Sequence, residues 1–409
     1  MSSRSNPQGG PPGLWIVVTH GTTARLLLRG QLAYLRQNGF AVTVVGSPGP
    51  DLDRAAEREG VRSLAVPMSR EISPFKDLGA LLRLLRLLRQ ERPQIVSAGT
   101  PKAGLLAMLA ARLARVPARL YLLRGLRLET ARGLRRWLLT AAERLAAVCA
   151  HRVICVSSSL RARYLELGLT TPDKARVLGS GSSNGIDLHR FDRPELDGAG
   201  DELRRALGIP PEAKVVGFVG RLTRDKGIAD LVRAFGRLRS QLGDARLLLL
   251  GRLEDGDPVD REIVERIRAG EGIHAPGEVD DPERYYRAMD LLAFPSYREG
   301  MPNVPLEAAA CRRAAVGYRV TGTVDAIVDG ETGRLVEPGD WPGLADAVLG
   351  YLLDPELRAA HGEAARRRVE AELRHERLRE LWRQEYVDLL TEKRLAPPGA
   401  TATAERPPS

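Results

Sequence analysis

The chain has 409 residues, of which 43% are apolar and 28% are charged, so it is long enough for two or three domains that each bury a core. This composition excludes a disordered or fibrous protein, and no apolar run approaches the roughly 18 residues that cross a bilayer. The net charge of +10 is uneven, because residues 1–195 hold 30 Lys and Arg against 14 Asp and Glu, which leaves −6 for the rest. A basic half favours an anionic partner: a nucleic acid, a phosphorylated substrate or an anionic membrane surface.

The two ends of the chain and its cysteines bear on its compartment. The start, MSSRSNPQGGPPG, has no apolar segment of the secretory kind, and the three cysteines form no C-x-x-C pair. We therefore expect a cytoplasmic protein with reduced thiols. Residues 1–12 and 396–409 are rich in Pro, Gly, Ser, Thr and Ala, and we predict disordered tails there.

Between these tails, short apolar strands alternate with helices, which is typical of a parallel sheet covered on both faces. The strands expected before a polar segment at 191–201 are 14–20, 40–46, 93–99, 118–125, 151–159 and 175–181, with helices near 25–38, 76–90 and 101–114. The same alternation restarts beyond that segment. The strands expected there are 214–220, 245–251, 290–296 and 313–320, with helices near 227–242, 258–269, 281–289 and 304–311.

This organisation predicts an α/β protein with two domains in tandem. The N-terminal Rossmann-like domain should span 13–195 and the C-terminal one 203–370. Residues 371–395 should form a charged helix that has no strand of its own and must pack on a domain already built.

The segment after the strand at 214–220 carries two cations. A tight turn at Gly220 and the side chains of Arg221 and Lys226 precede the helix that starts near Gly227. Ligands bind beyond the carboxyl ends of strands in doubly wound sheets, and a helix start offers free N–H groups. Two fixed cations suit a diphosphate, whose negative charge grows when a glycosyl bond breaks. Taken alone, the pair is equally consistent with two solvated residues in a loop.

Two glutamates, Glu299 and Glu307, flank the seven residues Gly-Met-Pro-Asn-Val-Pro-Leu. Gly300, Pro302 and Pro305 favour a turn that opens a helix, with Glu299 on the loop and Glu307 about one turn into the helix. Carboxylates accept several hydrogen bonds from sugar hydroxyls. As isolated residues, two glutamates at a helix start are more commonly partners of the helix dipole.

The segments GFVGRLTRDKGI, LLAFPSYREGMPNVPLEAAA and VTGTVDAIVDGETGRLV, in this order, resemble the retaining glycosyltransferases of family 4, which have the GT-B fold. The upstream segments ISPFKDL, GTPKAGLLAMLAA, LRGLRLET, VICVSSSLR and GSGSSNGIDLHRF resemble the bacterial subgroup that builds capsule or other surface polysaccharide on a lipid carrier. The resemblance covers about residues 14–385. It implies two Rossmann-like domains that face each other across a cleft, with the final helix crossing back onto the N-terminal domain.

The resemblance also implies roles for the motif residues. Arg221 and Lys226 would hold the donor diphosphate, Glu299 would contact the transferred sugar, and Glu307 would contact the ribose. The other donor-binding residues that it implies are Gly220, Gly300, Met301, Pro302, Asn303 and Val304, with Glu278 and Val279 beside the base.

A further set of candidates would line the cleft on the acceptor side: His20, Gly21, Thr22, Lys102, Arg124 and Asn184. His20 stands in a segment where many members have a Gly-Gly turn, and it either lines the cleft or is structural. Arg124 stands where many members have a histidine that touches the sugar, so it departs from the family pattern. It could instead face a phosphate of the donor or the acceptor.

Basic residues beside leucines suggest a membrane contact. The helix with Arg83, Arg86, Arg89 and Arg92 would either lie on an anionic leaflet or pack its leucines on the sheet and leave its arginines in water. A second cluster of arginines surrounds Trp137. The residues alone favour packing on the sheet, and the basic charge of this half together with the lipid-carried acceptor implied by the resemblance keeps both alternatives open.

No histidine pairs with another histidine or with a cysteine at metal spacing, and Asp51-Leu-Asp53 is typical of a helix cap. We therefore predict no metal and no cofactor, with the nucleotide sugar as a substrate.

The sequence predicts a metal-independent hexosyltransferase. It should move a hexose or N-acetylhexosamine from a nucleotide-diphosphate sugar, with UDP expected by resemblance, to a polyprenyl-diphosphate-linked saccharide in cell-surface polysaccharide synthesis. Two alternatives of the same fold stay open: a glycosyltransferase with a soluble natural-product acceptor, and a nucleotide-sugar 2-epimerase. A nucleic-acid binder is disfavoured, because the chain has no stacking aromatics interleaved with arginine beyond Trp137.

Overall fold

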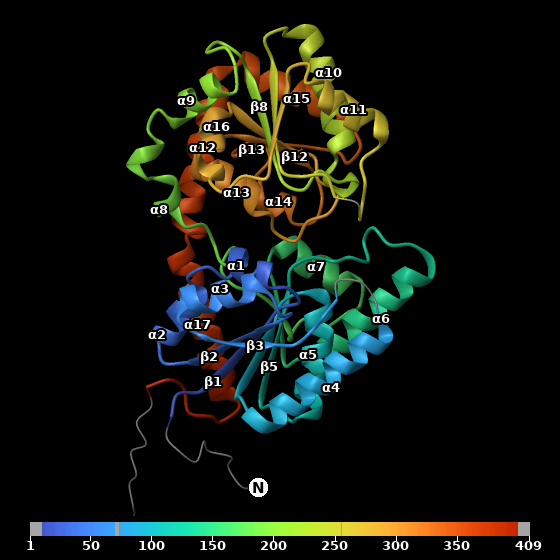
Figure 1. The fold of residues 1–409 in the computed structure, drawn as a ribbon, viewed down its shortest axis with the longest axis vertical. Coiled ribbons are helices and arrows are strands. Elements are labelled where there is room, and N and C mark those ends of the chain that lie inside the picture. Colours follow the sequence, from blue (N-terminus) through green and yellow to red (C-terminus); the bar gives the residue numbers. More distant parts are fainter. Residues whose placement is uncertain (1–9, 70–72, 255, 400–409) are drawn as a thin grey trace, which may run out of the picture. The chain divides into compact units, whose positions relative to one another are not determined.

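The computed structural model describes residues 10–69, 73–254 and 256–399, so most of the predicted tails at 1–12 and 396–409 lies outside the described residues. The chain divides into two compact units. Unit 1 contains the described residues up to Val156, Arg161–Gly179 and those from Arg377 onward, and unit 2 contains Ser157–Leu160 and Ser180–Glu376. Each unit is built on one parallel sheet, which confirms the predicted α/β fold class (Figure 1).

The sheet of unit 1 has seven strands in the order β3-β2-β1-β4-β5-β6-β7. Trp15 of β1 pairs with Thr43 of β2 on one side, and Ile16 pairs with Ser97 of β4 on the other, so β1 lies where the strand order reverses. The strands are β1 (Gly13–Val17), β2 (Ala41–Gly46), β3 (Arg62–Ala65), β4 (Ile95–Ala98), β5 (Ala118–Leu123), β6 (Arg152–Cys155) and β7 (Ala175–Val177).

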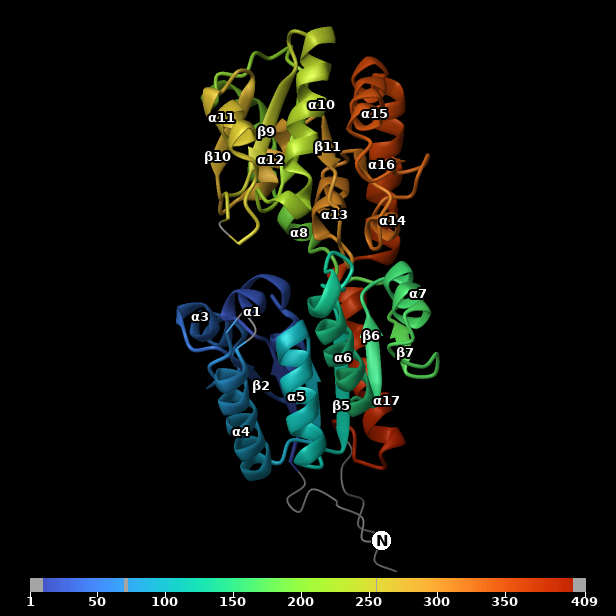
Figure 2. The ribbon, with the colours of Figure 1, turned by 90° about the vertical axis from the view of Figure 1, so that its right-hand side faces the viewer.

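Helices cover both faces of this sheet. On one face, α4 packs on α5 and α5 packs on α6, and these three helices lie side by side in Figures 1 and 2. On the other face α1 packs on α3, and α2 contacts both α3 and β2. The helices are α1 (Gly21–Leu27), α2 (Gln31–Gln37), α3 (Pro50–Glu59), α4 (Pro74–Glu91), α5 (Pro101–Leu113), α6 (Gly133–Cys149) and α7 (Ser158–Glu166).

The single helix predicted near 25–38 is wrong, because the chain forms two short helices there. Gly30 separates α1 from α2 and has a φ of 71°, which a glycine adopts without strain. The buried carboxylate of Glu59 then accepts hydrogen bonds from the backbone N–H groups of Gly30 (2.8 Å) and Ala33 (3.1 Å). A carboxylate supplied by α3 therefore caps α2, a contact that local sequence periodicity does not reveal.

The last helix, α17 (His375–Glu392), belongs to unit 1 from Arg377 onward. This confirms the prediction that the final helix returns to the N-terminal domain. Trp382, Tyr386 and Leu389 are buried in it, and the Tyr386 hydroxyl donates a hydrogen bond to Ser97 Oγ of β4 (3.0 Å). Arg152 of β6 forms an ion pair with Glu385, and both side chains are buried. The helix therefore completes the core of unit 1.

Unit 2 contains a six-stranded sheet in the order β10-β9-β8-β11-β12-β13, so its strand order reverses between β8 and β11. The strands are β8 (Val215–Val219), β9 (Arg246–Leu250), β10 (Ile273–Gly277), β11 (Leu291–Phe294), β12 (Ala315–Tyr318) and β13 (Gly333–Val336). The helices are α8 (Leu188–Phe191), α9 (Ala199–Ala206), α10 (Ile228–Gln241), α11 (Arg261–Ala269), α12 (Pro282–Ala288), α13 (Asn303–Ala310), α14 (Thr323–Ala326), α15 (Trp341–Leu353) and α16 (Pro355–Glu372), with 3-10 turns η1 (Pro194–Leu196) and η2 (Arg224–Lys226).

The helices of unit 2 form two layers. In one layer α10 packs against α11 and α15, and in the other α12 packs against α9 and α13, with α13 also against α16. Figure 2 shows α10 and α15 as neighbours. The strand order places the segments after β8 and after β11 next to each other at the carboxyl edge, where doubly wound sheets bind their ligands.

Candidate active site

The residues of the two sequence motifs follow neighbouring strands of unit 2. Arg221 and Lys226 lie between β8 and α10, and Glu299 lies between β11 and α13. Gly227 lets these two segments approach closely, because its φ is 69° and a Cβ there would lie 2.0 Å from the Pro295 carbonyl oxygen. The structure therefore brings the basic motif and the first glutamate together at the reversal of the strand order.

Lys226 and Glu299 form a direct ion pair between Nζ and Oε1. Their side chains are only 15% and 12% exposed, so the pair is largely shielded from water. The same ammonium lies 5.8 Å from the centre of the Phe294 ring, which adds a cation–π contact. The ammonium of Lys226 and the carboxylate of Glu299 thus neutralise each other's charge at this site.

Arg221 belongs to the same network through Asp225. Its guanidinium contacts Glu254 (2.9 Å) and Asp225 (3.5 Å), and Asp225 also accepts from Arg298 (3.1 Å). Burial alone would lower the pKa of Arg221, but Glu254, Asp225 and the charge of Glu299 raise it above its ordinary value. Arg221 is therefore a permanent cation that lies near Glu299.

The pKa of Asp225 is lowered. Burial would raise it, but a hydrogen bond from the Thr223 hydroxyl (2.6 Å) and the charges of Lys226, Arg221 and Arg298 outweigh that effect. Asp225 therefore stays ionised and fixes the direction of two guanidinium groups. The spacing of the motif gave no indication of this role.

Glu307 occupies the fifth position of α13, close to the predicted place one turn into the helix. The Tyr286 hydroxyl of α12 donates a hydrogen bond to its Oε2 (2.8 Å). Burial raises the pKa of Glu307, and the Tyr286 hydrogen bond and the charge of Arg190 oppose that rise. Its described partners thus differ from those of Glu299.

The segment Gly300–Pro302 leads into α13, whose N-terminus has no side-chain cap. Asn303 and Val304 form the first turn and are half-buried, and their N–H groups are among those that a helix start leaves unbonded. Since Pro302 and Pro305 have no N–H group, the available donors are few and definite. This end of the helix is suited to an anion.

Ser157 holds this segment in place. Its side chain is fully buried, and its Oγ donates a hydrogen bond to the Gly300 carbonyl oxygen (2.6 Å). Close by, the Gly322 N–H donates to Ser159 Oγ (2.8 Å), and Asp325 accepts from the N–H groups of Ser158 (3.0 Å) and Ser159 (3.2 Å). Asp325 thus caps α7 from α14. These contacts join segments far apart in the sequence, and no motif spacing indicates them.

Glu278, Val279 and Asn184 are the remaining predicted residues of unit 2. Glu278 and Val279 follow β10, two strands from β8 and so about 10 Å away across the sheet, and Glu278 pairs with Arg252 (2.8 Å). Asn184 precedes Gly185, whose φ is 70°, and the following Ile186 N–H donates a hydrogen bond to the Leu373 carbonyl oxygen (2.8 Å).

The N-terminal candidates lie in unit 1 at the carboxyl edge of its sheet. His20 is the N-cap residue of α1, Gly21 is the first residue of that helix, and Thr22 donates to Asp51 Oδ2 (2.7 Å). Asp51 and Asp53 are in the first turn of α3, whose N-cap is Gly49, so the prediction that Asp51 caps the helix is wrong. Thr22 is thereby committed to a contact between helices.

Lys102 and Arg124 differ in their surroundings. The Lys102 ammonium, at the start of α5, lies 2.7 Å from Asp77 of α4, so a neighbouring carboxylate offsets its charge. Arg124 directly follows β5, and burial lowers its pKa to about 10. Its Nε and Nη1 are buried and have no hydrogen-bond partner among the residues that the structure describes.

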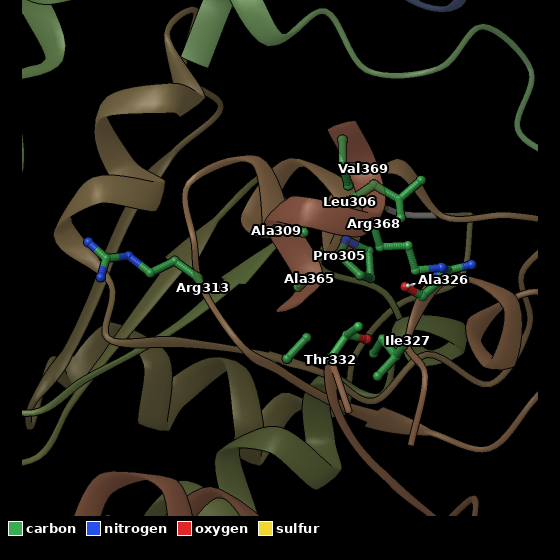
Figure 3. A pocket seen from close by; sticks show the side chains of 11 residues that line it. Pro305, Leu306, Ala309, Arg313, Ala326, Ile327, Thr332, Ala365, Arg368 and Val369 are labelled. Atoms are coloured by element: carbon green, nitrogen blue, oxygen red, sulfur yellow. Dashed lines mark hydrogen bonds between the residues drawn. The ribbon is translucent and has the colours of Figure 1, made fainter. Parts of the chain in front are cut away.

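A small cavity lies on the other side of α13, between that helix and α16 (Figure 3). It has room for about one water molecule. Pro305, Leu306 and Ala309 line it from α13, and Arg368 uses its guanidinium to bind the carbonyl oxygens of Asp325 (2.6 Å) and Ala326 (3.1 Å). This cavity is too small for a nucleotide sugar.

Within residues 10–69, 73–254 and 256–399, no cluster of three or more His, Cys, Asp or Glu side chains is placed to hold a metal ion. In the same part of the chain, no helix combines the length and the apolar character needed to span a bilayer.

The chain is similar in sequence to known glycosyltransferases. A family model for "Glycosyl transferases group 1" matches residues 213–354, and one for a "Glycosyl transferase 4-like domain" matches residues 22–181. The chain is 36% identical over 346 residues to the capsular polysaccharide biosynthesis glycosyltransferase CapM of Staphylococcus aureus, which covers 84% of this chain and 89% of CapM. The lipopolysaccharide core biosynthesis mannosyltransferase LpcC of Rhizobium leguminosarum is 36% identical over 198 residues, 47% of this chain and 55% of LpcC.

Solved structures with low sequence identity share the fold. HepE of Anabaena in complex with UDP-glucose superposes with a TM-score of 0.76 at 19% identity, over 93% of this chain and 100% of that chain. WaaG, a glycosyltransferase involved in lipopolysaccharide biosynthesis, superposes with a TM-score of 0.68 at 16% identity, over 88% and 95%. With its two parallel sheets, its returning C-terminal helix and its match to CapM, the chain belongs to the group 1 glycosyltransferases of family 4 and has their GT-B fold.

Proposed function

We propose that this glycosyltransferase moves a hexose or N-acetylhexosamine from a UDP sugar to a polyprenyl-diphosphate-linked saccharide, with retention of the anomeric configuration, in the synthesis of a capsular or other surface polysaccharide. The observation that carries the proposal is the shielded pair of Lys226 and Glu299 beside Arg221, at the reversal of the strand order in unit 2.

Donor binding would exchange the partners of this pair. A diphosphate beside Lys226 would take over the ammonium, and Glu299 would then be free to accept hydrogen bonds from the hydroxyls of the transferred sugar. Both groups already lie in place, so little reorganisation is needed when charge develops on the leaving diphosphate. One contact thus links recognition of the sugar to stabilisation of the leaving group.

Arg221 and the first turn of α13 would complete the diphosphate site. Arg221 is held by Glu254 and Asp225, and the N–H groups of Asn303 and Val304 add neutral donors. With these cations and helix dipoles on the leaving group, the reaction needs no bound metal, and no protein nucleophile is required. The donor phosphate itself would accept the proton of the attacking hydroxyl.

Glu307 would bind the ribose. Its Oε2 already accepts from Tyr286, which leaves Oε1 for the two ribose hydroxyls. Glu278 and Val279, at the end of β10, would lie beside the base, and Gly220 would allow the backbone to approach the nucleotide.

UDP and a role in surface-polysaccharide synthesis are supported by the relatives. HepE is described in complex with UDP-glucose, and CapM is named for capsular polysaccharide biosynthesis. The acceptor-side residues in this proposal are His20, Gly21, Thr22, Lys102, Arg124 and Asn184.

A basic and apolar surface on unit 1 supports a contact with the cytoplasmic face of an anionic membrane. Phe75 near the start of α4 is 92% exposed, and Trp137 near the start of α6 is 65% exposed. Both helices start at the carboxyl edge of the sheet on either side of α5, so these two ends share one side of the unit. The other apolar members of this surface, Leu78, Leu82, Leu134 and Leu138, are exposed, as are the cations Lys76, Arg83, Arg132, Arg135 and Arg136.

The charges of this surface are complementary to anionic lipid. The first turn of α6 has no acidic residue, and the one acidic residue in the first turn of α4, Asp77, is paired with Lys102. Apolar side chains that enter the headgroup region beside cations bind an anionic leaflet.

The proposal is tested by incubation of the protein with a panel of nucleotide sugars and a polyprenyl-diphosphate sugar, with nucleotide release and the anomeric form of the product as readouts. We expect acceptor-dependent UDP release that persists in EDTA, with an α-linked product from an α-linked donor. A released, altered sugar without any acceptor would instead identify a 2-epimerase, and dependence on an added metal would refute metal independence.

A further inference from the structure

Arg124 is a half-buried cation that the described part of unit 1 does not neutralise. Its Nε and Nη1 are buried and make no hydrogen bond to any described residue. Burial lowers its pKa to about 10, and the one group that opposes this effect is the Tyr386 hydroxyl, which donates its proton to Ser97. A guanidinium taken out of water without an anion is costly for the fold.

Arg119, on β5 itself, is an example of a structural arginine in this unit. Its guanidinium donates hydrogen bonds to the carbonyl oxygens of Cys149 (2.6 Å) and Val116 (2.7 Å), so burial is compensated by the backbone. Burial lowers its pKa as well. The guanidinium groups of these two arginines thus differ, because among the described residues only that of Arg119 has hydrogen-bond partners.

The surroundings of Arg124 suit an anion from outside the chain. It follows β5 at the carboxyl edge, and the neighbouring β4 leads through Thr100 into α5, a helix of 13 residues. No side chain caps α5, because the Thr100 hydroxyl bonds to Thr19 (2.6 Å) instead. The N–H groups of the first turn, after Pro101, therefore face the same edge without a side-chain acceptor.

We propose that Arg124 and the first turn of α5 form a binding site for an oxyanion of the acceptor, either the diphosphate of its lipid carrier or the carboxylate of an acidic sugar. This site deepens the proposed function and rests on it for the identity of the acceptor. The planar guanidinium binds phosphoryl and carboxylate oxygens in pairs, which a histidine at the same place would not do.

The first experiment compares thermal unfolding of two arginine variants without ligand. Three of the four tryptophans, Trp15, Trp137 and Trp382, lie in unit 1, so tryptophan fluorescence mainly follows this unit. Arg124→Met removes an uncompensated charge, and we expect it to raise Tm by about 2–8 °C. The matched control Arg119→Met strands backbone acceptors and should lower Tm.

The second experiment measures the Tm shift caused by inorganic pyrophosphate and, separately, by D-glucuronate. Both are added to the Arg221→Ala/Lys226→Ala protein, in which the two cations of the proposed donor site are absent. We expect at least one of the two anions to raise Tm, by roughly 5–10 °C at about 100 times its Kd. Addition of Arg124→Met should abolish this shift, and Arg124→Lys should weaken it.

The outcomes separate the two anion sources. A shift with pyrophosphate assigns the lipid diphosphate, and a shift with glucuronate alone assigns an acidic sugar. No shift with either anion, or a shift that survives Arg124→Met, overturns the site. If Arg124→Met and Arg124→Gln both lower Tm as Arg119→Met does, Arg124 is structural and the inference is wrong. Failure of UDP to raise Tm in the wild-type protein counts against the proposed donor site and leaves this result unaffected.

Discussion

Replacement of Lys226 by alanine should slow sugar transfer far more than it weakens donor binding. Lys226 pairs with Glu299 in the protein without donor, so its charge is already balanced before the reaction begins. The contact that matters for catalysis forms as charge grows on the leaving diphosphate. Since this interaction strengthens toward the transition state, its loss lowers kcat more than it raises KM.

The size of the effect follows from the surroundings of the pair. Two unit charges about 4 Å apart interact by about 4 kcal/mol at the effective dielectric constant of partly buried sites, and here the side chains are only 15% and 12% exposed. Removal of one such group from a developing negative charge typically costs 10²–10³-fold in kcat. We therefore expect kcat to fall by about that factor in Lys226→Ala, with KM for the donor raised less than about tenfold.

Arg224 is the matched control, because it lies in the same 3-10 turn as Lys226. Its side chain is 66% exposed and pairs with the exposed Asp260 at 3.5 Å. Arg224→Ala should change kcat by less than about twofold, since exposed ion pairs contribute little. UDP release in the presence of the polyprenyl-diphosphate sugar measures the rate of both variants. Equal rates in Lys226→Ala and wild type, or equal losses in both variants, would refute the role of Lys226.

Three further predictions concern other parts of the chain. Ser157→Ala removes the hydrogen bond to the Gly300 carbonyl oxygen, so the free energy of unfolding should fall by about 1–3 kcal/mol and the KM for the donor should rise. The control Ser158→Ala, at an exposed site, should match the wild-type protein in both measurements. Burial raises the pKa of Glu143 to about 7, so the folded state keeps a proton that the unfolded state has lost. Stability should therefore fall by roughly 3 kcal/mol between about pH 4.5 and 7, and denaturant titrations of Glu143→Gln should show no such slope. Trp137→Glu should weaken co-sedimentation with phosphatidylglycerol vesicles at least tenfold while leaving Tm unchanged; equal binding would refute the membrane surface.

Apolar periodicity predicted the fold well because it is a property of single segments. Four buried residues mark β11 and four buried leucines mark β9, and both strands were placed within two residues at their ends. The edge strand β3 was not predicted, since its residues are exposed or half-buried and leave no apolar run. The break at Gly30 depends on Glu59 from another helix, so periodicity joined α1 and α2 into one.

The candidate site was predicted in part for the same reason. Spacing and chain order were enough to place Arg221 and Lys226 after one strand and Glu299 after another, and parallel topology then made them neighbours. The contacts made by Asp225, Ser157 and Asp325 depend on tertiary packing between distant segments. The sequence likewise does not indicate that Arg124 Nε and Nη1 have no hydrogen-bond partner among the described residues, because this depends on tertiary packing.

The most direct test of the donor site compares the affinities of UDP and uridine by titration calorimetry. If Arg221 and Lys226 hold the diphosphate, the wild-type protein binds UDP far more tightly than uridine. In the Arg221→Ala/Lys226→Ala protein the two affinities should converge to within about tenfold while uridine binding stays the same, because charge-assisted contacts to both phosphates are lost. An unchanged preference for UDP in the double variant would contradict the account.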